Sequence, residues 1–228
     1  MEHGLFNIDC VEGMKQYPDG YFDLCLTDPP YGIDLGYNSF DDSDENLKEF
    51  ISVFMPEILR VSKRALITCG TKNIHYYPKP DWILSWISTA GVGCCKWGFT
   101  CWQPILAYGK DPYLTDKLGS RPDIIMSNEV SDKTVKFHPC PKPTKLWREI
   151  LLRGSVRDSD IILDPFMGSG TTAIVCNQTG RKNWVGFEKD GEYFNKAKER
   201  IERDVDKISL FEMPVKNKDV QLGLEVNA

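Results

Sequence analysis

A run of six residues, Thr27-Asp28-Pro29-Pro30-Tyr31-Gly32, constrains the fold of this chain more than any other stretch. It follows the apolar residues Phe22 to Leu26, which predict a buried strand that ends at this point. The two prolines set two consecutive φ angles near about −65° and remove two backbone donors. The chain can therefore neither continue the strand nor begin a helix here, and it must turn.

The groups left in this turn are hydrogen-bond acceptors and one aromatic ring. The Asp28 carboxylate and the Pro29 carbonyl can accept hydrogen bonds from an exocyclic amine, and Tyr31 offers a flat face on which a base can stack. This chemistry favours a nucleobase amino group as the ligand. The candidate catalytic residues are therefore Asp28, Pro29, Pro30 and Tyr31.

A second stretch has the form of a strand, a glycine-rich turn and a helix, over Ile161–Leu163, Asp164–Gly170 and Thr171–Gln178. The next predicted strand ends at Glu188, twenty positions after Gly168. An acidic side chain at this spacing accepts hydrogen bonds from ribose hydroxyls in nucleoside-binding α/β folds. The loop lacks the lysine of phosphate-binding loops, which disfavours nucleotide phosphate as its ligand.

Together the two stretches resemble the amino-group DNA methyltransferases that use S-adenosylmethionine, and the resemblance covers roughly Gly4 to Ile201. The catalytic turn precedes the cofactor loop, which resembles the circularly permuted β-group of that family. The resemblance implies one doubly wound, Rossmann-like α/β domain with a mostly parallel sheet. It also implies direct methyl transfer to an exocyclic nitrogen of a base flipped out of double-stranded DNA. Asp rather than Ser at position 28 favours N6 of adenine; N4 of cytosine and an inactive DNA-binding relative are the alternatives.

The resemblance further implies the contacts of the cofactor. Asp9 would lie beside the adenine ring, although it is equally placed to cap the helix that follows it. Lys142 would face the methionine carboxylate, and His138 in the same His-Pro-x-x-Lys-Pro element is interpreted as a turn histidine. No metal is implied. The candidate cofactor-binding residues are Asp9, Asp28, Lys142, Asp164, Pro165, Phe166, Gly168, Ser169, Gly170, Thr171, Thr172 and Glu188.

The rest of the chain alternates predicted strands and helices, as a doubly wound fold requires. We expect the segment Asp34 to Asn46 to be a loop, either a lid over the target base or a plain surface connection. The expected strands are 5–10, 64–70, 91–100 and 103–109, and the expected helices are 11–17, 47–61, 82–88, 146–152 and 191–203.

The predicted domain organisation is one catalytic domain over residues 1–206, with an irregular tail over 207–228. Periodicity is lost at about 111–136, where the resemblance places target recognition. A recognition segment this short suggests a short target, help from the 34–46 loop, or a second subunit in a homodimer. The motifs do not specify a restriction endonuclease partner.

The net charge of −5 disfavours a long sequence-independent grip on DNA, because phosphate contacts need lysine and arginine. The most basic stretch runs from Lys133 to Arg157 and is equally well interpreted as a solvated face. The eight cysteines form no C-x-x-C pair and are expected to be reduced thiols. The chain begins without a leader pattern and has no long apolar stretch, so we expect a soluble, cytoplasmic protein with no membrane contact.

Overall fold

The computed structural model describes residues 2–37, 40–129 and 131–211. The main sheet contains β1 (Gly4–Phe6), β2 (Leu24–Thr27), β3 (Arg64–Thr68), β4 (Trp82–Ile87), β7 (Trp102–Gly109), β8 (Ile124–Met126), β9 (Ile162–Asp164) and β10 (Trp184–Phe187). A separate hairpin is made by β5 (Gly93–Cys95) and β6 (Gly98–Thr100). The helices are α1 (Cys10–Met14), α2 (Asp44–Val61), the 3-10 turn η1 (Ile74–Tyr76), α3 (Pro112–Thr115), α4 (Thr144–Gly154), α5 (Thr171–Gln178) and α6 (Gly191–Phe211).

The main sheet has the strand order β1-β10-β9-β2-β3-β7-β4-β8, and only β7 runs antiparallel to its neighbours β3 and β4. The strand before the catalytic turn and the strand before the glycine-rich loop lie side by side, with Leu24 opposite Ile162. This confirms the expected doubly wound α/β fold. Both strands end at the same edge of the sheet, which brings the two sequence motifs together.

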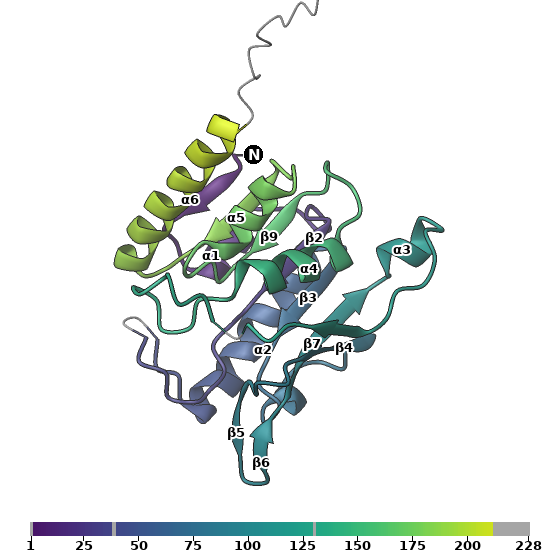
Figure 1. Cartoon of the computed structure of the whole chain (residues 1–228), viewed down its shortest axis with the longest axis vertical. Helices are drawn as coiled ribbons and strands as arrows, with labels where there is room; N and C mark the ends of the chain where they lie inside the picture. Colours follow the sequence, from purple (N-terminus) through teal and green to yellow (C-terminus); the bar gives the residue numbers. More distant parts are fainter. Residues whose placement is uncertain (1, 38–39, 130, 212–228) are drawn as a thin grey trace, which may run out of the picture.

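Helices cover both faces of this sheet (Figure 1). Successive strand residues alternate between the two faces, as the pleat requires. Cys25 joins the core that also contains residues of α1 and α2, whereas Leu24 and Leu26 join the core beneath α4 and α5. The burial of β2 on both sides explains its continuous apolar sequence.

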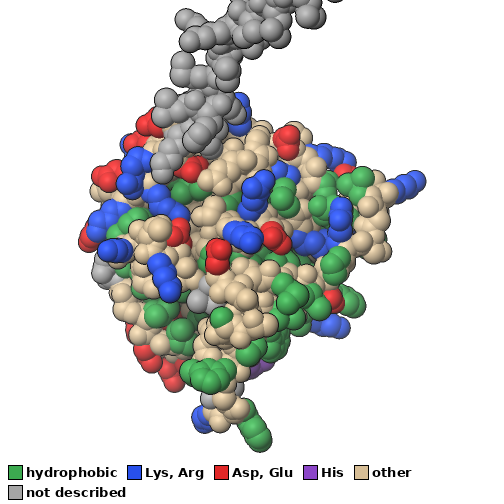
Figure 2. All heavy atoms as spheres, viewed as in Figure 1, with side chains coloured by type: hydrophobic (Ala, Val, Ile, Leu, Met, Phe, Trp, Pro, Cys, Tyr) green, Lys and Arg blue, Asp and Glu red, His purple; other side chains and the backbone are tan. Residues whose placement is uncertain are grey.

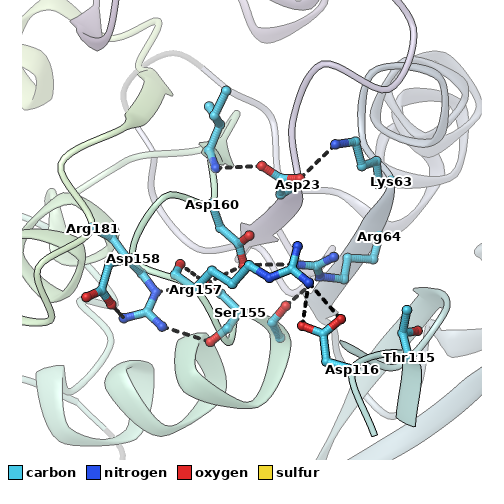
Figure 3. Close-up of polar contacts among 12 residues, drawn as sticks. Asp23, Lys63, Arg64, Thr115, Asp116, Ser155, Arg157, Asp158, Asp160 and Arg181 are labelled. Carbon is cyan, nitrogen blue, oxygen red and sulfur yellow. Dashed lines mark hydrogen bonds and ion pairs between the residues drawn. The ribbon is translucent and has the colours of Figure 1, made fainter. Parts of the chain in front are cut away.

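At the opposite edge, the starts of three parallel strands are joined by charged side chains (Figure 3). Arg64 pairs with the buried Asp160 carboxylate at 2.9 Å, and Lys63 pairs with Asp23 at 2.8 Å. Asp23 also accepts a 2.9 Å hydrogen bond from the backbone N–H of Ile161. This network aligns the amino ends of β2, β3 and β9, and thereby fixes the relative positions of the turns at their other ends.

The helix expected at residues 82–88 is wrong, because this segment is the strand β4. Its buried side chains, Leu84 and Trp86, recur with a period of two, and the strand pairs with both β7 and β8. Pairing on two sides decides the conformation here, since a short apolar segment is ambiguous from its own pattern. The glycine-broken stretch 91–100 is likewise two strands, the hairpin β5–β6.

Two further expectations are corrected near the C-terminus and in the aperiodic segment. Helix α6 does not end near Arg203 but continues to Phe211, so residues 207–211 of the expected tail are helical rather than irregular. The rest of the expected tail lies outside the described residues. The segment 111–136 contains α3 and the edge strand β8, which pairs with β4. Within the described residues, no helix has the length and apolar character needed to cross a membrane.

Candidate active site

The candidate catalytic turn, residues 28–31, lies just beyond β2, where the Asp28 carboxylate is held by three donors. Its Oδ1 accepts hydrogen bonds from the Thr68 hydroxyl at 2.5 Å and from the Tyr31 hydroxyl at 2.6 Å. Its Oδ2 pairs with the Lys142 ammonium group at 2.5 Å. The carboxylate is therefore fixed in orientation by contacts with the end of β3 and with a distant loop.

Tyr31 is folded back against this carboxylate rather than extended into solvent. Its hydroxyl donates to Asp28 and is also contacted by the side-chain amide of Gln103 on β7. Burial raises the pKa of Tyr31 well above its ordinary value, and the nearby Asp28 charge raises it further. The phenol therefore stays protonated at neutral pH, and Lys142 lies 5.0 Å from the centre of its ring.

The backbone after Tyr31 is clamped by Asp42 and Asn73. The buried Asp42 carboxylate accepts hydrogen bonds from the backbone N–H groups of Gly32, Ile33 and Leu35, at 2.7, 3.3 and 3.1 Å. Asn73 donates to the Tyr31 carbonyl at 2.6 Å. The first part of the expected 34–46 loop is thus tied to the turn. The last three residues of that expected loop are helical, because α2 begins at Asp44 rather than at Leu47.

The glycine-rich loop after β9 is built around Asp164. Its buried carboxylate accepts hydrogen bonds from the hydroxyl groups of Thr27 and Thr172 and from the Phe166 backbone N–H. Burial raises the pKa of Asp164 to about 6, against the opposing effect of these donors. The hydrogen-bonding capacity of the Asp164 carboxylate is therefore used by groups of the protein itself. Through Thr27 it links the glycine-rich loop to the strand that precedes the candidate catalytic turn.

Gly168 has no steric room for a side chain. Its φ of +50° lies in the left-handed region, and a Cβ atom there would lie 2.8 Å from Nε2 of His138. Its backbone N–H donates to Oε2 of Glu188 at 2.9 Å. The loop therefore passes closely between the His138 ring and the end of β10.

Glu188 and Asp9 follow the ends of β10 and β1. Glu188 accepts a second hydrogen bond, from the Asp190 N–H at 2.8 Å, and burial raises its pKa above the ordinary value. Asp9 caps α1 by accepting from the Val11 N–H at 3.0 Å, and it lies 3.3 Å from Lys189. The capping interpretation of Asp9 is thus observed, and its carboxylate still lines the same cavity as Glu188.

Residues 138–143 cross over this loop and bring Lys142 to the catalytic turn. Burial alone would lower the pKa of Lys142, but the Asp28 carboxylate outweighs it and raises the pKa above its ordinary value. His138 packs between Tyr37 and Tyr193, with ring centres 6.1 and 5.1 Å away. Its burial lowers its pKa to about 4, so the ring is neutral at neutral pH. Lys142, placed by the resemblance at the methionine carboxylate, contacts Asp28 here.

These parts surround one cavity that is open to solvent. Its wall includes twelve of the predicted site residues: Asp9, Asp28, Pro30, Lys142, Asp164, Pro165, Phe166, Gly168, Ser169, Thr171, Thr172 and Glu188. Pro29, Tyr31 and Gly170 do not line it. Pro29 is buried, Tyr31 lies behind Asp28, and Gly170 is the left-handed N-cap of α5.

Several residues of the site carried no recognisable signal in the sequence. Thr68 and Gln103 hold Asp28 and Tyr31 from neighbouring strands. Their only sequence signal is a polar side chain in a buried strand. The cavity also has an aromatic wall, which includes Tyr37, Phe40, Phe50 and Tyr193. Such rings are indistinguishable from core residues until the fold places them around an opening.

The basic stretch 133–157 does not form one surface. Lys133, Lys136, Lys145 and Arg148 are exposed, whereas Lys142 is buried against Asp28. Arg153 and Arg157 pair with Asp111 and Asp116. These two arginines lie near the start of β3, because Gly109 pairs with Arg64 just before Asp111. The expected DNA patch is thus reduced to its exposed lysines and Arg148.

The side chains that line the cavity fit S-adenosylmethionine. It combines a mostly apolar wall with a few carboxylates and the ammonium groups of Lys142 and Lys189. Gly168 and Glu188 both line the cavity. The residues present therefore match a nucleoside with a charged amino-acid end.

Comparison with known proteins defines the class. The model for DNA methylases of the N6/N4 type matches residues 86–199, half of the chain. The chain therefore belongs to the N6/N4 DNA methylase family. It is a DNA methyltransferase, its substrate is DNA, and the family takes its methyl group from S-adenosyl-L-methionine.

Individual relatives agree with this assignment. The chain is similar to the type II methyltransferase M.HpaI of Haemophilus parainfluenzae, with 28% identity over 240 residues covering 90% of this chain and 76% of that protein. It is also similar to the type II methyltransferase M1.MboII of Moraxella bovis, with 28% identity over 248 residues covering 85% of this chain and 94% of that protein.

Two solved structures share the fold. The M1.HpyAVI–SAM complex superposes with a TM-score of 0.60 at 22% identity, covering 86% of this chain and 98% of that chain. The PvuII DNA methyltransferase, described as cytosine-N4-specific, superposes with a TM-score of 0.64 at 16% identity, covering 91% and 93%. At these identities the similarity shows a shared fold, and it does not show which atom of the base is methylated.

Proposed function

We propose that this DNA methyltransferase methylates the exocyclic N6 of adenine in double-stranded DNA. The observation that carries the proposal is the position of Asp28, an acceptor at the junction between the cofactor-type cavity and the Tyr31 ring. A carboxylate can accept a hydrogen from the amine, and Asp rather than Ser at this position favours N6 of adenine, as the resemblance of the turn implies. N4 of cytosine is the alternative, because an amine at that position presents the same donors.

The catalytic residues then act by orientation. Asp28 and the Pro29 carbonyl accept the two amine hydrogens, so that the nitrogen lone pair is directed towards the cavity. Tyr31 stacks on the flipped base once its hydroxyl leaves Asp28. When bound, the cofactor supplies an electrophilic methyl group. As the nitrogen takes up positive charge during transfer, its hydrogen bond to the Asp28 carboxylate strengthens and stabilises the transition state.

Different residues of the cavity then contact different parts of the cofactor. Glu188 accepts from the ribose hydroxyls, Asp9 lies by the adenine ring, and the Gly168 region approaches the nucleoside closely. Lys142 is placed to attract the methionine carboxylate, in competition with its present partner Asp28. Such competition would release one oxygen of Asp28 for the target amine.

The test is transfer of a labelled methyl group to duplex DNA, RNA and protein in parallel, followed by nucleoside analysis. N6-methyladenine in duplex DNA is the expected product, and the Asp28→Ala variant is the inactive control. N4-methylcytosine would establish the alternative, and label in RNA or protein alone would overturn the proposal. Methylation-aware sequencing of DNA from expressing cells would then read out the target sequence.

A further inference from the structure

The hairpin β5–β6 stands apart from the main sheet. Its two strands pair only with each other, with Cys94 opposite Phe99 and Cys95 opposite Gly98, which leaves Lys96 and Trp97 at the turn. It connects the end of β4 to the start of β7 and projects from the body of the molecule (Figure 1). The turn of the hairpin is therefore accessible to a binding partner.

The projecting turn is aromatic. The Trp97 side chain is 98% exposed and that of Phe99 is 81% exposed. Figure 2 shows the corresponding protrusion, with hydrophobic side chains at its tip. A large ring left in water forgoes the stabilisation that burial would bring, and two such rings on one projecting turn form an apolar patch of the kind that marks interaction sites.

The root of the hairpin is part of the candidate active site. Gln103, the second residue of β7, contacts the Tyr31 hydroxyl, and Ile105 of the same strand pairs with Thr68, which holds Asp28. The hairpin thus leaves the sheet at the edge where the catalytic turn lies. The strand that follows the hairpin therefore contacts the residue proposed to stack on the target base.

The segment expected to recognise DNA is placed less favourably. Helix α3 follows Gly109, which pairs with Arg64 at the amino end of β3. The chain returns along β8, so that only the part after Met126 reaches the catalytic edge. Residues 111–123 accordingly lie at the wrong end of the sheet to contact a base held at Asp28.

The chemistry of the turn suits DNA. Aromatic side chains stack on bases, and wedges of this kind enter base steps that are partly unstacked. The exposed Lys96 next to Trp97 provides a cation for the phosphate backbone. Because the net charge is −5, phosphate contacts alone give little affinity, and stacking contacts become correspondingly valuable.

We propose that Trp97, supported by Phe99, inserts into the duplex beside the target base and occupies the stacking space that this base leaves when it flips. The inference rests on the proposed transfer to a flipped base in duplex DNA. In this proposal the hairpin, rather than residues 111–123, is the element that opens the DNA duplex. Occupation of the gap by an aromatic ring lowers the cost of extruding the base.

The experiment compares Trp97→Ala with Trp82→Ala, a matched change of a Trp that is 63% exposed at the other end of β4. Single-turnover methylation is measured on two duplexes that carry the target sequence found by sequencing. One duplex is fully paired, and the other has the target base opposite an abasic site. Cofactor affinity is measured by titration calorimetry, and oligomeric state by sedimentation.

Trp97→Ala is expected to slow methylation of the paired duplex by about 10-fold to 100-fold. The loss should be much smaller on the duplex whose target base is already unpaired, and Trp97→Phe should recover part of the rate. Trp82→Ala should behave as the parent. Equal losses on both duplexes, no loss on either, or an altered oligomeric state in Trp97→Ala would overturn the role of the hairpin. Failure of the parent protein to methylate any duplex would instead overturn the proposed function.

Discussion

The Lys142 ammonium nitrogen lies 2.5 Å from Oδ2 of Asp28, and the Lys142 side chain is only 6% exposed. This ion pair connects the loop that crosses the cofactor-type cavity to the catalytic turn. A cation buried this deeply requires a counter-charge, and Asp28 supplies it. The charge of the candidate catalytic carboxylate is therefore balanced by a residue of the cofactor site.

Replacement of Lys142 tests the pair directly. We expect Lys142→Gln to lower the free energy of unfolding by up to about 3 kcal/mol, because Asp28 loses its cation in a poorly solvated place. Urea unfolding at pH 7 measures the change. Lys145→Gln, at an exposed position three residues later, is the control and should stay close to the parent. Equal midpoints for the two variants would show that the ion pair does not contribute.

Asp28→Asn should leave no more than trace methyl transfer. The amide keeps the shape and one acceptor oxygen, but its NH2 group cannot accept hydrogen bonds from Thr68 or an amine. Loss of one oriented transition-state partner costs about 100-fold to 1000-fold in rate. The measurement is the single-turnover rate on DNA with saturating cofactor. A rate within a few-fold of the parent would make Asp28 a structural residue.

Tyr31→Phe separates the two properties of this side chain. The variant loses the hydroxyl that donates to Asp28 but keeps the ring. If the ring stacks on the base, the rate of methyl transfer should stay within a few-fold of the parent, whereas Tyr31→Ala should lose about 10-fold or more. Comparable losses in both variants would assign the role to the hydroxyl instead.

Glu188→Ala is expected to weaken binding of S-adenosylmethionine, by on the order of 1.5 to 3 kcal/mol for each charge-assisted hydrogen bond to the ribose. Titration calorimetry gives the affinity directly. Glu192→Ala, an exposed glutamate at the start of α6, is the control. DNA affinity should be unchanged in both variants. Unaltered cofactor affinity in Glu188→Ala would remove Glu188 from the site.

His138 makes the stability of the protein depend on pH. Its pKa of about 4 in the folded protein lies below the ordinary value of 6.5, because burial disfavours the charged ring. Between these two values the unfolded chain binds more protons, so the contribution of His138 is complete above pH 6.5 and is lost as the pH falls towards 4.

The corresponding variant is His138→Asn, which has no such titration. When the pH is lowered from 7.5 to 4.5, the unfolding free energy of the parent should fall by about 2 kcal/mol more than that of the variant. Urea titrations at a series of pH values provide the measurement. A difference that is constant over this range would show that the ring is solvated when folded.

The motifs of the site were predictable because they are encoded by local stereochemistry. Two adjacent prolines terminate a strand. Glycine is required at position 168 because the backbone there has a positive φ and leaves no space for a Cβ atom. The spacing from Gly168 to Glu188 follows from the length of one helix and one strand. The sequence alone therefore determined the two loops, their strands and the doubly wound class of the fold.

Tertiary structure decided which distant residues meet. The pairing of Lys142 with Asp28 and the support from Thr68 and Gln103 depend on strand order and on a loop that crosses the cavity. Segment 82–88 became a strand because β7 and β8 pair with it, and its own apolar pattern suited either conformation. The direction of β7 likewise placed the hairpin at one edge of the sheet and residues 111–123 at the opposite edge. Strand directions are decided only when the whole sheet assembles.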